Sequence, residues 1–176
     1  TVALPAALSG GAGTMQDQDG TGWNTLALKG IWRPQGIKGT HIVDFGFQQD
    51  SHKLHILKSN ILGNWLSDSG GSLVNDVGGK TQLRSLYIQD RWALAPKWAT
   101  VLGARVENWR ASDGFTRFSA SSVANTAYAS RDENFISPKA ALSYQWSDDT
   151  VLKASTGRAV RMPTVAELYG ATSTIN

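Results

Sequence analysis

The stretch KAALSYQW (residues 139–146) decides the fold class, because its side chains alternate between two chemical characters. The even positions carry the apolar residues Ala140, Leu142, Tyr144 and Trp146, and the odd positions carry Lys139, Ala141, Ser143 and Gln145. This period of two is typical of a β-strand with one apolar face. We therefore predict a strand here.

The same alternation recurs along the chain, although Asp90 breaks it by falling on an apolar face. No helical period is sustained, apart from a turn or two near residues 163–169. The pattern predicts an all-β protein with about six strands, most of them longer than the usual 5–6 residues. The expected ranges are about 22–33, 39–58, 80–94, 97–110, 134–146 and 150–161.

The connections between these strands alternate in length. Short turns are expected around residues 34–36, 95–97 and 147–149, and long polar loops over about 59–80 and 110–134. An antiparallel up-and-down meander places all the short turns on one rim and all the long loops on the other. Outer-membrane barrels have this asymmetry, which favours a transmembrane β-barrel wall.

Tryptophan supports the membrane interpretation. It accounts for 7 of the 16 aromatic residues, and four of the seven lie near the short turns on apolar faces: Trp32, Trp92, Trp98 and Trp146. Such a belt is expected at a membrane–water interface. Alternation alone does not say which face is inside, so a soluble β-barrel binding module stays open. In a soluble barrel, Leu142, Tyr144 and Trp146 would face a dry core.

Composition excludes several classes of protein. The 176 residues carry a net charge of +3, and only 18% are charged. Intrinsic disorder needs fewer aromatic residues and more net charge. With no cysteine, the chain has no disulfide, thiolate metal site or cysteine nucleophile. The sequence contains no run of about 18 apolar residues, so it predicts no membrane-spanning helix. The chain begins at Thr1 without a basic signal-peptide region, so we expect an internal fragment.

No motif predicts catalysis or a cofactor. Gly79-Lys80-Thr81 echoes a phosphate-binding loop, but Val74 stands where the required glycine would be. On a strand, His52 and His55 point to opposite faces, so they predict no metal site. No G-x-S-x-G elbow is present. We expect no enzyme activity, and the singly scattered basic residues give no nucleic-acid patch.

In a barrel, the charged residues of the strands project into the lumen. The candidates for a ligand pathway there are Arg105, Glu107, Lys139 and Lys153. A mildly cationic lumen suits an anionic solute. The alternative is that these charges only solvate the wall and pair with carboxylates such as Asp44.

Three stretches, taken in order, resemble the TonB-dependent outer-membrane receptors. The first is His41-Ile42-Val43-Asp44-Phe45-Gly46-Phe47, and the second joins residues 87–92 (YIQDRW) to residues 102–107 (LGARVE). The third runs from residue 137 through residues 151–158 to Arg161-Met162-Pro163-Thr164 and Glu167-Leu168-Tyr169. Arg161, Pro163 and Glu167 match a family motif, for which we expect a structural role. Together these stretches cover most of residues 22–170.

The resemblance implies a 22-stranded barrel of the Gram-negative outer membrane, plugged by an N-terminal domain that this chain omits. It implies uptake of a scarce solute, usually a ferric siderophore, driven by TonB through the missing N-terminal region. Ligand contacts are then expected in the loops 59–80 and 110–134 and after Arg161. A passive porin or autotransporter barrel stays open as the alternative.

Overall fold

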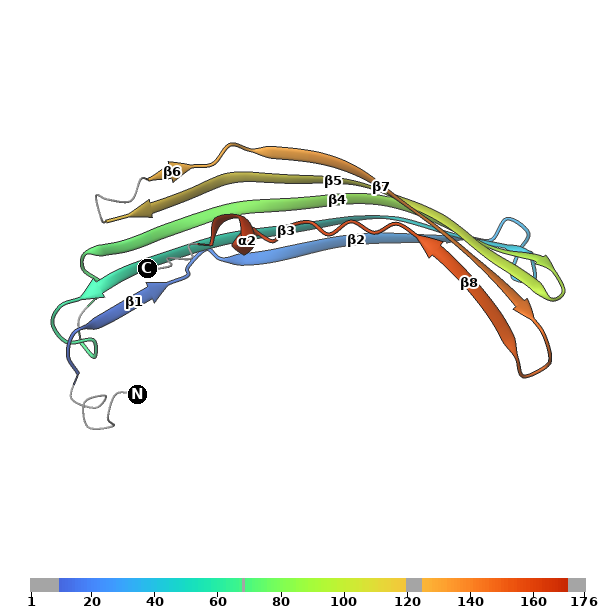
Figure 1. Ribbon diagram of the computed structural model, residues 1–176, viewed down its shortest axis with the longest axis horizontal. Coiled ribbons are helices and arrows are strands. Elements are labelled where there is room, and N and C mark those ends of the chain that lie inside the picture. The colour runs from blue at the N-terminus through green and yellow to red at the C-terminus, as the bar shows by residue number, and fades with distance from the viewer. Residues whose placement is uncertain (1–9, 68, 120–124, 171–176) are drawn as a thin grey trace.

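The computed structural model describes residues 10–67, 69–119 and 125–170, which form one antiparallel sheet and a short helix (Figure 1). The strands are β1 (Gly13–Asp17), β2 (Gly22–Trp32), β3 (His41–Ile61), β4 (Leu73–Ala95), β5 (Trp98–Phe118), β6 (Thr126–Ala127), β7 (Arg131–Gln145) and β8 (Val151–Gly157). The helix is α2 (Val165–Tyr169). No helix of these residues is long and apolar enough to cross a bilayer.

The sheet is an up-and-down meander. Its strand order is β1-β3-β4-β5-β7-β8, with β2 also paired to β3 and β6 also paired to β5. β1 and β2 lie along successive parts of one edge of β3, and β6 and β7 share β5 in the same way. The eight strands therefore occupy six positions, which confirms the predicted antiparallel wall. The two outermost positions do not pair with each other, so the sheet is open.

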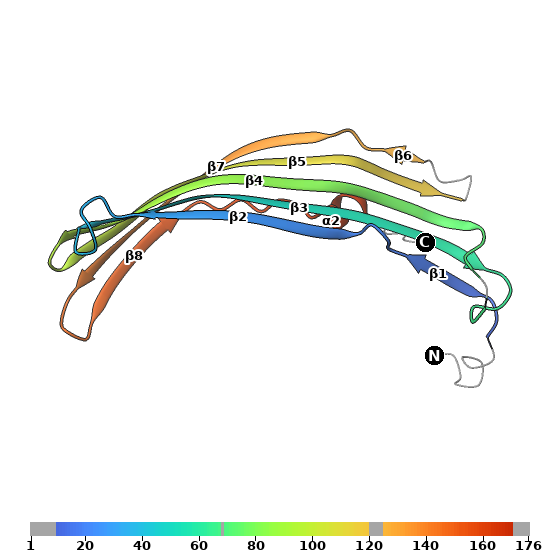
Figure 2. The ribbon, with the colours of Figure 1, turned by 180° about the vertical axis from the view of Figure 1, so that it is seen from behind.

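The three short turns that the sequence predicted gather at one end of the sheet. Residues 33–40, 96–97 and 146–150 turn at the right of Figure 1, whereas the longer connections lie at the left. We call these the short-turn end and the long-loop end. The view from behind shows the same segregation (Figure 2).

Three central strands are longer than predicted at the long-loop end. β3 continues to Ile61, β4 begins at Leu73 rather than near 80, and β5 continues to Phe118 rather than ending near 110. The predicted loops 59–80 and 110–134 therefore shrink to 62–72 and 119–130, of which residues 68 and 120–124 lie outside the described part. The alternation fails here because polar residues such as Lys80, Gln82 and Arg84 continue the apolar row of β4, and because the β4–β5 register shifts between Gly78 and Lys80.

The other strands differ less from prediction. β2 covers Gly22–Trp32, and β7 covers Arg131–Gln145, close to the expected 22–33 and 134–146. β8 ends at Gly157 instead of 161, because the chain leaves the sheet there and folds back across it. β1 and β6 are short segments that alternation did not predict.

One face of the sheet, which we call the tryptophan face, carries the four turn-proximal tryptophans. Their exposed fractions are 59% for Trp32, 39% for Trp92, 40% for Trp98 and 65% for Trp146. Leu86, Leu102, Leu142 and other apolar side chains of this face are also about half exposed. No layer of the described residues covers them. The soluble alternative requires a dry core on this side, and the described residues do not form one.

The apolar part of the tryptophan face has the height of a bilayer core. On β5 it runs from Trp98 through Leu102 to Val106. At about 3.4 Å per residue and a tilt of about 40°, this stretch rises about 21 Å, close to the band of about 25 Å on outer-membrane barrels. The next row is polar, with Arg84 donating to Gln49 at 3.0 Å and Asn108 donating to Asn134 at 3.0 Å.

Candidate functional site

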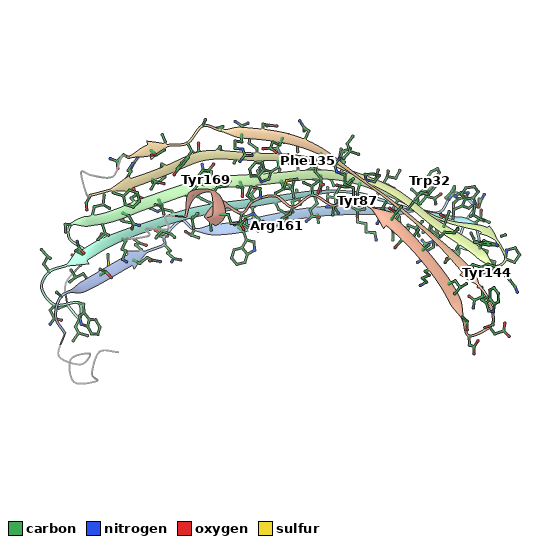
Figure 3. All side chains as sticks on the ribbon, in the orientation of Figure 1. Trp32, Tyr87, Phe135, Tyr144, Arg161 and Tyr169 are labelled. Atoms are coloured by element: carbon green, nitrogen blue, oxygen red, sulfur yellow. The ribbon has the colours of Figure 1, made fainter. Side chains whose placement is uncertain are left out.

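Residues 158–170, which we call the strap, cross the opposite face of the sheet (Figure 3). We call this face the strap face. Register places Tyr87 of β4 directly opposite Gly46 of β3 and Arg105 of β5. The Tyr87 ring fills the space that a side chain at Gly46 would need. Arg105 then lies over that ring, 5.4 Å from its centroid. The glycine thus allows an aromatic–guanidinium stack on the strap face.

A hollow of about 450 Å³ lies between this stack and the start of the strap. Its charged lining consists of four cations and two carboxylates: Lys29, Arg105, Lys139, Arg158, Asp44 and Glu107. Cations therefore outnumber carboxylates by two, so the hollow can attract an anion.

Both carboxylates of the hollow have partners on the wall. Lys29 Nζ is 3.6 Å from Asp44 Oδ1, and Glu107 accepts a hydrogen bond of 3.0 Å from the Ser137 hydroxyl. Arg105 reaches Ser85 at 3.4 Å. Lys139 and Arg158 make no ion pair within the described residues. These two cations are therefore available to pair with an anionic ligand or with another part of the protein.

The structure brings together three of the four predicted lumen residues. Arg105, Glu107 and Lys139 line the hollow. Lys153 lies on the same face but pairs in register with Ser143, toward the short-turn end. Since Lys139 is opposite Gly157, Lys153 is four residues away along β8, or about 14 Å.

The strap is fixed to the sheet by its own short helix. Thr164 caps α2: its side chain accepts from the Glu167 backbone N–H, and the Glu167 carboxylate accepts from the Thr164 backbone N–H. Arg161 also pairs with the Glu167 carboxylate. These hydrogen bonds, the one from the Thr164 backbone above all, hold the pKa of Glu167 below its ordinary value. Two predicted motif residues, Arg161 and Glu167, are therefore brought together, and Pro163 lies between them.

Tyr169 anchors the end of the strap in the only part of the described sheet that has a dense apolar core. It is 4% exposed and packs with Trp109 and Ala111. Its ring lies over Gly79 of β4 and Gly114 of β5, where any side chain would collide with it. Burial raises the pKa of the Tyr169 hydroxyl. The Glu-Leu-Tyr segment thus acts as an anchor on two adjacent strands.

A second group of strap-face residues lies nearer the long-loop end. Trp23 is 79% exposed and sits opposite His52, and Arg131 lies over the Trp109 ring at 5.4 Å. From the sequence alone, His52 is considered only as a metal ligand. Sequence reasoning did not single out Trp23, Trp109 or Arg131. Parity offered a signal, because Trp23 and Trp109 are odd-numbered, unlike the four tryptophans of the opposite face.

The histidines are placed without a metal centre. Within the described residues, no group of three or more His, Asp or Glu side chains could hold a metal ion. His55 Nε2 lies 3.1 Å from Asp76, which also pairs with Arg117 at 3.3 Å. His41 pairs with Asp90 on the tryptophan face at 2.7 Å.

In a comparison with protein families, residues 5–176 match the family described as "TonB dependent receptor-like, beta-barrel". Searches of the curated proteins and of the solved structures return no match. The matched range includes every described strand and the strap.

Proposed function

Because the chain belongs to the TonB-dependent receptor β-barrel family, we propose that it is a sector of the barrel of a receptor for a ferric siderophore. Receptors of this family are transporters, not enzymes. They reside in the Gram-negative outer membrane and take up a solute with energy supplied through TonB. On this assignment the tryptophan face contacts outer-membrane lipid and the strap face lines the lumen.

The open sheet supports the idea of a sector. The edges formed by β1/β2 and by β8 carry unpaired backbone groups. Lipid offers these groups no hydrogen-bond partners, so further strands must close the wall. In a plugged barrel of 22 strands, the six strand positions of this sheet would form about a quarter of the wall. The plug and the TonB-contacting segment belong to the rest of that receptor.

The charge of the lumenal hollow carries the proposal for the solute. Its cations exceed its carboxylates, and Lys139 and Arg158 are exposed and unpaired among the described residues. Siderophores chelate iron through oxygen anions, so their ferric complexes commonly carry negative charge. Arg105, Glu107 and Lys139 would lie on the ligand pathway, with Lys153 lower on the same wall.

Uptake by the receptor that contains this chain tests the proposal. We expect iron-starved cells to take up radiolabelled iron with an anionic siderophore, in a manner that requires TonB. The substitutions Arg105→Gln and Lys139→Gln together should lower uptake about tenfold. Arg117→Gln is the matched control, because Arg117 is exposed on the other face. Equal uptake by the double variant and the control, or uptake limited to iron-free solutes, would contradict the proposal.

A further inference from the structure

Two hollows lie one above the other on the tryptophan face, where the apolar band ends. The lower one has a volume of about 450 Å³. Leu86, Val106 and Ile136, which are 45–58% exposed, line its apolar side. Arg84, Asn108 and Asn134, in the next row toward the long-loop end, line its polar side. The lower hollow therefore has an apolar wall inside the band and a polar rim just above it.

The upper hollow, of about 510 Å³, is basic. Lys53 and Lys80 lie opposite each other in its lining, and Gln82 lies opposite Arg110 one row below. Gln82 and Arg84 are two residues apart on one face of β4, which separates them by about 7 Å. The two hollows are therefore adjacent steps on the same surface.

The basic residues of this surface exceed its acids. Of the nearby carboxylates, Asp113 pairs with Lys80 at 2.8 Å, and Asp76 pairs with Arg117 at 3.3 Å. Asp132 accepts a hydrogen bond of 2.7 Å from Asn108. Among the described residues, neither Lys53 nor Arg110 has a carboxylate within ion-pair distance, and both side chains are exposed.

We propose that the two hollows bind a phosphorylated, acylated lipid of the outer leaflet. An acyl chain lies against Leu86, Val106 and Ile136, and a phosphate of the headgroup contacts Arg84 and Arg110, with Lys53 beside them. The apolar band fixes the depth of the acyl chains, and the first exposed cations stand directly above it. A free anion would use only the upper hollow, so the lower one favours an amphiphile.

The assignment rests on the family membership, which sets the band in the membrane, and not on the identity of the transported solute. Lipid binding and siderophore uptake are therefore separable measurements. A receptor that fails to transport a ferric siderophore would still bind the lipid at this surface.

Lipid titration of the delipidated, detergent-purified receptor that contains this chain is the test. The probe is lipid A with both phosphates, and the readout is the mass of the complex in native mass spectrometry. We expect one lipid to bind to this surface. The double variant Arg84→Gln/Arg110→Gln should weaken the affinity at least tenfold. The control Arg33→Gln/Lys97→Gln removes the same charge near the short-turn end and should leave it unchanged.

Three further arms make the result decisive. Dephosphorylated lipid A should bind at least tenfold more weakly, and inorganic phosphate should not compete at millimolar concentration. Raising the salt from 0.05 to 0.5 M should weaken lipid A binding by the wild-type receptor, since exposed charge contacts are screened. This arm needs no variant. Equal affinity of the two double variants, equal binding of dephosphorylated lipid, or competition by phosphate alone would overturn the proposal.

Discussion

Asp90 carries a carboxylate on the tryptophan face, and His41 explains how it is accommodated there. The His41 Nδ1 atom lies 2.7 Å from Asp90 Oδ2, and the His41 ring stacks on Trp92 with 5.2 Å between centroids. The other oxygen, Asp90 Oδ1, is buried and has no hydrogen-bond partner among the described residues. The residue that broke the sequence pattern therefore joins two of the motif stretches, residues 41–47 and 87–92, across the β3–β4 pair.

Removing one member of this pair should cost more than removing both. We expect His41→Leu to lower the free energy of unfolding by about 1–3 kcal/mol, because it leaves the carboxylate unpaired. The double variant His41→Leu/Asp90→Leu should recover part of that loss. Urea unfolding of the detergent-folded receptor measures the coupling. Strictly additive losses would show that the two side chains do not stabilise each other.

The Glu167 carboxylate should make the docking of the strap sensitive to acid. Its lowered pKa means that the carboxylate stabilises the folded strap at pH values above the ordinary glutamate value, and that this stability is lost as the pH falls through the lowered pKa. We expect a spin label at Ala166→Cys to become mobile as the pH falls through that lowered pKa. The chain has no cysteine of its own, so the label is unique within it. In Glu167→Gln, mobility should no longer depend on pH in this range.

The alternation of odd and even positions along each strand predicted which face a residue lies on. It did not predict which residues lie next to each other. Arg105, Glu107 and Lys139 share one face as expected, because alternation along a strand fixes which side a residue takes. Alternation says nothing about register. Register is what stacks Arg105 on Tyr87 and separates Lys153 from the other three. The pairing of Arg161 with Glu167 depends in turn on the helical turn between them.

At the scale of elements, β4 and β5 form the socket that holds the strap. β5 has an extra residue opposite Gly79, and Asp113 within this bulge has a φ of 56°. Aspartate tolerates that left-handed conformation, and Lys80 pairs with its carboxylate and lowers its pKa. The bulge leaves Gly114 beside Gly79, so two adjacent strands offer bare backbone at one spot. Tyr169 occupies it.

Filling this socket should release the strap without disturbing the sheet. We expect Gly114→Ala to destabilise the docked strap by about 1–3 kcal/mol, the usual range for overpacking, because the new methyl group would collide with the Tyr169 ring. Gly22→Ala is the matched control, since nothing lies within 4 Å of a methyl group there. The spin label at position 166 reports both variants. Equal mobility in the two would refute the socket.

The ends of the long strands were the least predictable elements. Up to about Leu86 and Val106, an apolar side chain at every second position marks the strand. Farther along, Arg84, Gln82 and Lys80 occupy the positions that continue the apolar row. With this row polar and a bulge shifting the register, no continuous hydrophobic period separates these strand ends from a loop. Only backbone pairing defines them.

At the scale of the whole molecule, the sheet is a wall with two open edges. We predict that the isolated 176-residue chain aggregates or stays unfolded in detergent, because lipid does not tolerate unpaired strand edges. The measurement is electrophoresis of heated and unheated samples. A species that migrates faster before heating would be a folded barrel and would contradict the prediction. The receptor that contains this chain, run in parallel, is the positive control.

The architecture of the wall could be predicted because turn length and tryptophan position are both visible in the sequence. The return of residues 158–170 across the wall could not. Its anchor depends on glycines of β4 and β5, which lie 90 and 55 residues before Tyr169 in the chain, respectively, and no local pattern links them.

The strands β3, β4 and β5 have 21, 23 and 21 residues, roughly twice what a bilayer requires. Their ends therefore stand clear of the lipid as a rigid, hydrogen-bonded collar. Hydrogen–deuterium exchange would find these amides as protected as those within the membrane, and would place the outer boundary of the bilayer far too high. Quenching of tryptophan fluorescence by brominated lipid would locate the opposite boundary at Trp32, Trp92, Trp98 and Trp146. For this protein, protection of a backbone amide from exchange therefore does not show that the residue lies within the bilayer.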